Sequence, residues 1–114
     1  MLRSLLTSAD MPIKKPNVQH LIETAWNAGN IQLSNFHGNQ RSKERLIGAT
    51  EIRDVILYGT REAQSDTDKG THWIYALRNM NVDGRDIRIM FDIEDYPNVV
   101  IVTLMHVYSK GRSW

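Results

Sequence analysis

The spacing of apolar residues predicts two amphipathic helices in the first half of the chain. Over residues 16–27, apolar side chains recur at the i, i+3, i+4, i+7 and i+8 positions of one helix face, and a glycine follows: Val18, Leu21, Ile22, Ala25 and Trp26, then Gly29. A second stripe predicts a helix that begins with Thr50 as its cap and ends at Gly59 in the left-handed conformation: Ile52, Val55 and Ile56. Both stripes are expected to be buried.

A polar, basic helix is predicted between these two. Ser34 or Asn35 can cap its first turn. Three nitrogen-bearing side chains then fall on one face at i, i+4 and i+8: His37, Arg41 and Arg45. Large apolar residues are few in this segment, so the helix can bury little of itself. It is therefore the first place in which functional side chains are sought.

The apolar period changes to two after Gly59. Strands are predicted over 61–65, 71–82, 85–93 and 99–108, with a polar and exposed loop at 66–70. Asp83-Gly84 predicts a two-residue hairpin turn, because both positions of a type I′ turn need positive φ. Residues 30–33 are expected to form a brief extended link or a short strand. The last strand is apolar on both faces, which is typical of a central strand.

This order predicts an α+β fold. Two to three N-terminal helices would pack on a three- to four-stranded antiparallel sheet, in a single domain over residues 16–110. Residues 1–15 are expected to form a loosely docked arm, and residues 111–114 a tail.

Composition narrows the function classes. The chain has 114 residues, no cysteine and a formal net charge of +1. Disulfides and thiolate chemistry are excluded, and the chain is expected to be cytoplasmic and without a membrane segment. The four histidines lack ligand spacing, so neither a metal nor a cofactor is expected.

One stretch also carries a family resemblance. The residues that carry it are Gly29, Asn30, Ile31, Leu33, Ser34, His37, Arg41, Arg45, Ile47, Ile52, Val55, Ile56 and Gly59, with Val102 and Thr103 further on. Over about residues 29–105 the chain resembles a bacterial family known as domain of unknown function 4258. Gly38 and Met105 depart from its pattern, where alanine and an aromatic residue are usual.

That family is similar to the RelE, barnase and colicin E-type ribonuclease toxins, which implies a ribonuclease-toxin-like fold and metal-independent cleavage of RNA through the ribose 2′-hydroxyl. The resemblance implies a general base or acid at His37 and phosphate-binding guanidiniums at Arg41 and Arg45. Further candidates lie in the predicted sheet: a phosphate contact at Arg88, and positioning or acid groups at Thr103, His106 and Tyr108.

Structural roles for the same residues stay open. His37 can bond a backbone carbonyl or Glu44, and the two helix arginines can form a solvated, ion-paired surface. Arg88 can pair with Asp86 or Asp92, and Thr103 can simply fill a strand. His72 and His106 are most simply polar-face strand residues.

The leading hypothesis is a toxin-like endoribonuclease. RNA and an antitoxin or immunity protein are its partners, and an exposed edge strand at 61–65 would permit a homodimer. The alternative is a non-catalytic domain that binds protein or nucleic acid, or a regulatory protein that has kept the fold and lost the chemistry. A net charge near zero and the lack of a lysine-rich groove weigh against a free ribonuclease.

Overall fold

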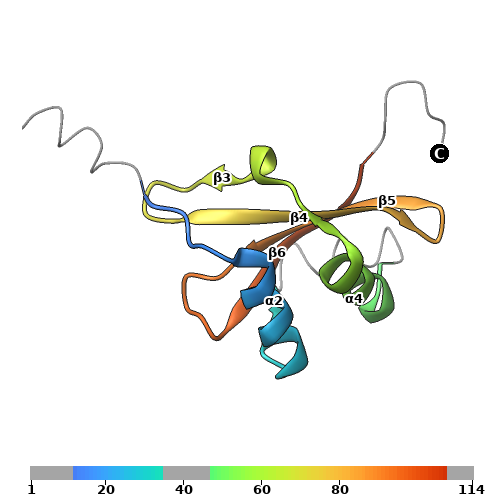
Figure 1. Cartoon of the computed structure of the whole chain (residues 1–114), viewed down its shortest axis with the longest axis horizontal. Helices are drawn as coiled ribbons and strands as arrows, with labels where there is room; N and C mark the ends of the chain where they lie inside the picture. Colours follow the sequence, from blue (N-terminus) through green and yellow to red (C-terminus); the bar gives the residue numbers. More distant parts are fainter. Residues whose placement is uncertain (1–11, 35–46, 108–114) are drawn as a thin grey trace, which may run out of the picture.

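The structure of the chain, a computed structural model, describes residues 12–34 and 47–107. Figure 1 shows these residues as helices on one side of a twisted sheet. The helices are α2 (Val18–Asn27) and α4 (Ala49–Tyr58). The strands are β1 (Ile31–Leu33), β2 (Thr60–Arg61), β3 (Thr67–Asp68), β4 (Trp73–Val82), β5 (Arg85–Asp92) and β6 (Val99–His106), and the 3-10 turn η1 (Ala63–Ser65) precedes β3.

The sheet formed by the described residues has six strands and is mixed. Its order is β1-β6-β5-β4-β2, with β3 also paired to β4. β4, β5 and β6 form an antiparallel meander, whereas β1 runs parallel to β6 with Ile31 opposite Val99. The predicted three- to four-stranded antiparallel sheet is therefore wrong, and α4 follows β1 rather than preceding the whole sheet. The third predicted helix, from Ser34 onward, lies largely outside the described residues.

The reason for the mixed sheet is hydrogen bonding along β6. The backbone amide of Val99 donates to the Asn30 carbonyl at 2.9 Å, and the Ser34 amide donates to the Ile101 carbonyl at 2.9 Å. Without β1, the backbone groups on this side of β6 would lack these partners. Residues 31–33 thus form a short edge strand of the sheet, one of the two forms predicted for this segment.

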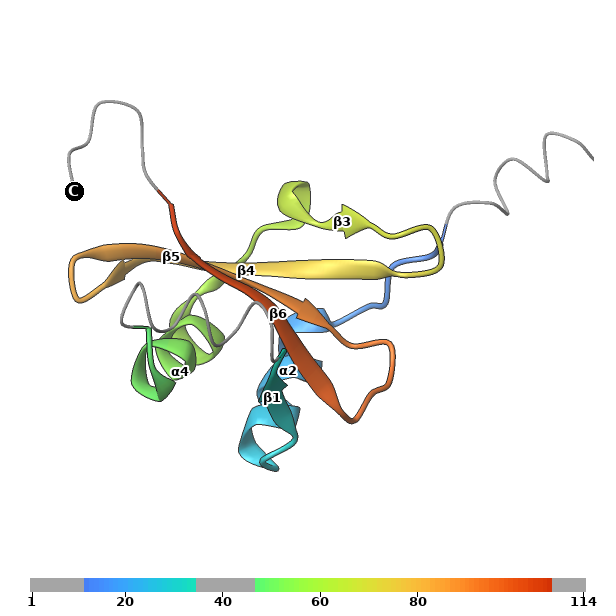
Figure 2. The same ribbon diagram turned by 180° about the vertical axis from the view of Figure 1, so that it is seen from behind.

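One face of the sheet packs against both described helices (Figures 1 and 2). The buried helix residues all belong to the predicted stripes: Val18, Ile22 and Ala25 of α2, and Ile52, Val55 and Ile56 of α4. Leu21 and Trp26, also predicted to be buried, are only partly buried. The alternating apolar residues of β5 and its end are fully buried, each at 0% exposure: Ile87, Ile89, Phe91 and Ile93. The periodicity therefore located this core, which covers only one of the two sheet faces.

The ends of α4 differ from the prediction. Its N-cap is Gly48, whose amide donates to the Glu51 carboxylate at 2.9 Å, so Thr50 lies inside the helix. Gly59 follows the helix with φ −84°, not in the left-handed conformation. Glycine is needed there for another reason: a Cβ would lie 2.4 Å from the Val55 oxygen and 2.8 Å from the Arg78 oxygen. The helix end and β4 are too close for a side chain.

The predicted strand over 61–65 and loop over 66–70 are also wrong. The strand ends at Arg61, η1 follows, and Thr67 begins β3. The cause is Asp66, whose fully buried carboxylate accepts two hydrogen bonds from Arg61, at 2.8 and 2.7 Å, and one from the Ala76 amide at 2.9 Å. This carboxylate draws the chain back against β4.

Residues 12–15 are attached to the same part of the sheet. The Trp73 indole donates to the Pro12 carbonyl at 2.8 Å, and the Lys15 amide donates to the Tyr75 hydroxyl at 2.8 Å. The Lys14 amine lies 2.9 Å from the buried Asp66 carboxylate and 4.4 Å from the centre of the Trp73 ring. The segment that enters α2 is therefore held by polar contacts with β4.

Candidate functional site

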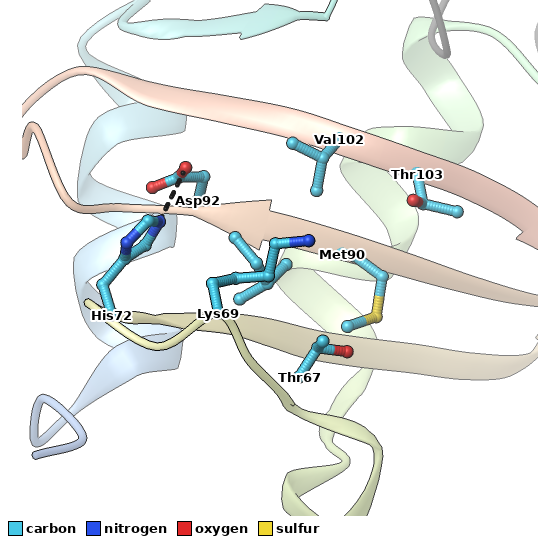
Figure 3. Close-up of a pocket in the computed structure, with 8 residues that line it drawn as sticks. Thr67, Lys69, His72, Met90, Asp92, Val102 and Thr103 are labelled. Atoms are coloured by element: carbon cyan, nitrogen blue, oxygen red, sulfur yellow. Dashed lines mark hydrogen bonds and ion pairs between the residues drawn. The ribbon is translucent and has the colours of Figure 1, made fainter. Parts of the chain in front are cut away.

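A depression of about 340 Å³ lies on the sheet face that neither described helix covers (Figure 3). Its volume is within the range of small-molecule sites. The floor is apolar, and the rim carries polar side chains from β3, β5 and β6 and from the β3–β4 turn: Thr67, Lys69, His72, Asp92 and Thr103 around Ile74, Met90 and Val102. In this depression an apolar floor adjoins an imidazole, a carboxylate and an amine.

A tight turn between β3 and β4 brings two of these groups together. Its backbone is closed by the Lys69 amide, which donates to the His72 carbonyl at 2.9 Å. Gly70 has φ +91°, a conformation that suits glycine, and its amide donates to the Asp68 carboxylate at 2.8 Å. Lys69 and His72 therefore stand on either side of one short turn at the edge of the depression.

His72 is held through both ring nitrogens. Its Nε2 lies 3.2 Å from Asp92 Oδ2, and its Nδ1 lies 2.8 Å from the Thr71 hydroxyl. A neutral imidazole satisfies both contacts when Nε2 donates to the carboxylate and Nδ1 accepts from the hydroxyl. The carboxylate would also stabilise an imidazolium, so the arrangement suits a histidine that accepts a proton and later returns it.

Lys69 supplies an amine that no described carboxylate neutralises. The residue is exposed, and its amine forms no ion pair with any carboxylate in residues 12–34 or 47–107. In Figure 3 its side chain extends over the depression from the β3 side toward β6. An ammonium group in that position can neutralise an anion placed above the apolar floor.

A bulge in β6 places Thr103 in the depression. Met90 pairs with Thr103, but Phe91 pairs with Ile101, so Val102 is an extra residue between them. Both Val102 and Thr103 consequently line the same depression, although neighbouring strand residues normally face opposite ways. The predicted candidate Thr103 therefore lines the same depression as His72, Lys69 and Asp92, on the side opposite His72 (Figure 3).

Two arginines lie further along the same sheet face in a network with two buried carboxylates. Arg78 donates to Asp86 at 2.9 and 2.7 Å and to Glu62 at 2.7 Å, and Arg88 Nε donates to the other oxygen of Glu62. Burial alone would raise the pKa of Glu62, but the hydrogen bonds from Arg88 and Arg78 outweigh it and lower the pKa from 4.5 to about 2. Asp86 and Asp92 were the two structural partners predicted for Arg88. Arg88 instead pairs with Glu62.

The remaining predicted residues divide into two groups. His37, Arg41, Arg45 and Tyr108 lie outside the described residues, so their roles stay predictions. His106 pairs with Ile87 across the sheet and therefore faces the helix-covered side, away from Thr103.

The grouping of His72, Asp92 and Lys69 was not predicted from the sequence. His72 and Asp92 are 20 residues apart, and the pairing of β4 with β5 brings them together by placing Ile74 opposite Asp92. The sequence does indicate that the two strands pair, because an alternating strand ends in an Asp-Gly turn. To place Asp92 beside His72, however, the register between the two strands must be known to one residue.

Comparisons with known proteins give no relative: no family model, no curated protein and no solved structure matches the chain. Within the part of the chain that the structure describes, no three His, Asp or Glu side chains are grouped so as to hold a metal ion. None of the helices described there is long and apolar enough to cross a membrane.

Proposed function

We propose that this chain is a toxin-like, metal-independent endoribonuclease that cleaves RNA through the 2′-hydroxyl, and that the depression on the uncovered sheet face receives the reacting nucleotide. The observation that carries the proposal is the hydrogen-bonded His72–Asp92 pair beside the Lys69 amine, which no described carboxylate neutralises. The proposed resemblance to the domain of unknown function 4258 family, with its ribonuclease-toxin relatives, supports the same chemistry.

The proposed reaction needs one base, one acid and one cation. His72 Nδ1 exchanges the Thr71 hydroxyl for the ribose 2′-hydroxyl and removes its proton, while Asp92 stabilises the imidazolium that forms. The 2′-oxygen attacks the adjacent phosphorus, and Lys69 neutralises charge on the phosphorane. The bond from phosphorus to the 5′-oxygen breaks, and that oxygen takes its proton from the general acid, the role proposed for His37. The products are a 2′,3′-cyclic phosphate and a 5′-hydroxyl.

The residues predicted from the resemblance complete this scheme. His37 would act as the second acid–base group, and Arg41 and Arg45 would bind the phosphate. These three residues lie outside the described part of the chain, so the proposal assigns them roles without geometry. Thr103 would hydrogen-bond the ribose or phosphate from the β6 side of the depression.

The second candidate function is a non-catalytic binding domain. It is favoured by the charges that surround the depression, because Arg61, Arg78 and Arg88 are each paired with a carboxylate. The described surface therefore has a weak overall field for attracting RNA.

RNA cleavage by the purified full chain, with a chelator present, tests the proposal. We expect 2′,3′-cyclic phosphate ends from a single-stranded RNA, and no cleavage of the same strand with 2′-O-methyl groups. His72→Ala should lower the rate by about 10²–10⁴-fold, the usual contribution of a general acid or base. His20→Ala is the matched control, because His20 is exposed on α2 and distant from the depression. A wild-type chain without activity, or equal rates for wild type and His72→Ala, would overturn the proposal.

A further inference from the structure

The uncovered sheet face has a second cationic group beyond the depression. Arg88 and Asp92 are four residues apart on β5, so both side chains point to this face, about 13 Å apart along the strand. Met90 lies between them and forms part of the apolar floor. Lys69 and Arg88 therefore mark opposite ends of one strip of surface.

Arg88 differs from Arg78 in how many of its donors are used. Arg78 donates from Nε and from both terminal nitrogens, so each nitrogen of its guanidinium has a partner. Arg88 donates only from Nε, to Glu62, and its two terminal nitrogens form no hydrogen bond with another described residue. Its side chain is 21% exposed. The planar guanidinium of Arg88 is thus held through Nε, and its two terminal nitrogens are available to a ligand.

The anchor of Arg88 is itself rigid. Glu62 is buried, and its second oxygen is fixed by Arg78, which is held in turn by Asp86. A guanidinium ordered before the ligand arrives loses little side-chain entropy on binding. This is the form in which arginine usually recognises a phosphate with two parallel hydrogen bonds.

We propose that Lys69 and Arg88 form two separate phosphate subsites at the ends of the apolar strip, and that the ligand is therefore a single-stranded oligonucleotide that spans both. A nucleotide between the two phosphates would lay its base or ribose on Met90 and Val102. Only an unpaired strand exposes base faces to such a floor, since the bases of a duplex are stacked inside it.

This inference rests on the proposed function for the identity of the ligand as RNA, but it concerns binding and not cleavage. It is measured in a His72→Ala background, in which a bound strand stays intact. The probes are a labelled single-stranded RNA of eight nucleotides, the same strand in a duplex, and uridine 3′-monophosphate as a ligand with one phosphate.

The test variants are Lys69→Ala and the double substitution Glu62→Gln/Arg88→Gln. The double substitution removes both charges of the pair, so no buried carboxylate is left without its arginine. Arg53→Ala is the control, because Arg53 is exposed on α4, which packs on the other sheet face. Far-UV circular dichroism verifies that each variant is folded.

Each subsite variant should weaken binding of the eight-nucleotide strand by about tenfold or more, as expected when charge-assisted hydrogen bonds are removed. The magnitude of the slope of log affinity against log salt should fall by up to about 0.7 for each phosphate that the variant no longer neutralises. Only Lys69→Ala should weaken binding of the mononucleotide, and the duplex should bind more weakly than the single strand.

Unchanged affinity and salt slope in the Arg88 variant would overturn the second subsite, even if the wild-type chain cleaves RNA. If strand binding depends on both Lys69 and Arg88 but the wild-type chain does not cleave RNA, the proposed reaction is refuted and this inference is supported. No measurable binding of the strand would overturn both.

Discussion

Replacing Glu62 by glutamine should make the stability of the chain less dependent on acid. Glu62 is 6% exposed and accepts hydrogen bonds from two arginines, Arg78 and Arg88. Glutamine has nearly the same shape, but it carries no charge and leaves one arginine facing an amide. The substitution therefore isolates the electrostatic part of this network from its packing.

The magnitude follows from the two pKa values of Glu62. Its pKa falls from 4.5 to about 2 on folding, a difference of about 2.5 pH units that corresponds to about 3 kcal/mol. Because the pKa is lowered in the folded state, this stability is fully present above pH 4.5 and is lost as pH falls through 4.5 toward 2. At pH 3 about 2 kcal/mol of it is already lost.

Urea unfolding at pH 7 and pH 3 measures this effect. We expect Glu62→Gln to be about 3 kcal/mol less stable than wild type at pH 7, and this deficit to shrink by about 2 kcal/mol at pH 3. Other acidic groups titrate in both chains and cancel in the difference. Glu94→Gln, at an exposed position without an ion pair to any described residue, should leave the profile unchanged. A deficit that is the same at both pH values would refute the electrostatic account of Glu62.

Three other substitutions test how the elements are joined. Gly59→Ala should cost about 3 kcal/mol, because its Cβ would overlap backbone oxygens of α4 and β4, whereas Gly48→Ala should change thermal stability little. Asp66→Asn should cost about 3–5 kcal/mol in denaturant unfolding, because its buried carboxylate binds an arginine, a lysine and a backbone amide; a cost below about 1 kcal/mol, as for exposed pairs, would contradict this. Tyr75→Phe should accelerate hydrogen exchange at the Lys15 amide, and an unchanged rate would show that this hydrogen bond does not hold the segment.

The local elements of this fold were predictable because their signals are local. The apolar stripes of α2 and α4 and the Asp83-Gly84 turn, with φ of +55° and +80°, follow from nearby residues alone. The parallel pairing of β1 with β6 depends on segments far apart in the chain, and no periodicity specifies it. The 61–65 segment departed from its pattern because one buried carboxylate, Asp66, reorganised it.

The candidate site depends on a one-residue irregularity in the pairing of β4 with β5. If β4 and β5 paired residue by residue from Val82 and Arg85 onward, Ile74 would lie opposite Ile93. The register shift between Asn79 and Val82 instead places Ile74 opposite Asp92. Tyr75 and Val82 are both in the core although strict alternation would put them on opposite faces. The burial of both residues on the same sheet face is a consequence of the register shift in β4. The same shift brings Asp92 within reach of His72.

The parallel edge strand also makes completion of the domain depend on the last strand. Ile31 finds its partner, Val99, 68 residues later in the chain. During synthesis β1 therefore remains without this neighbour until β6 has emerged. Closing so long a loop costs conformational entropy before the hydrogen bonds of the strand pair can form. Residues 31–33 therefore cannot take their place in the sheet before β6 is available.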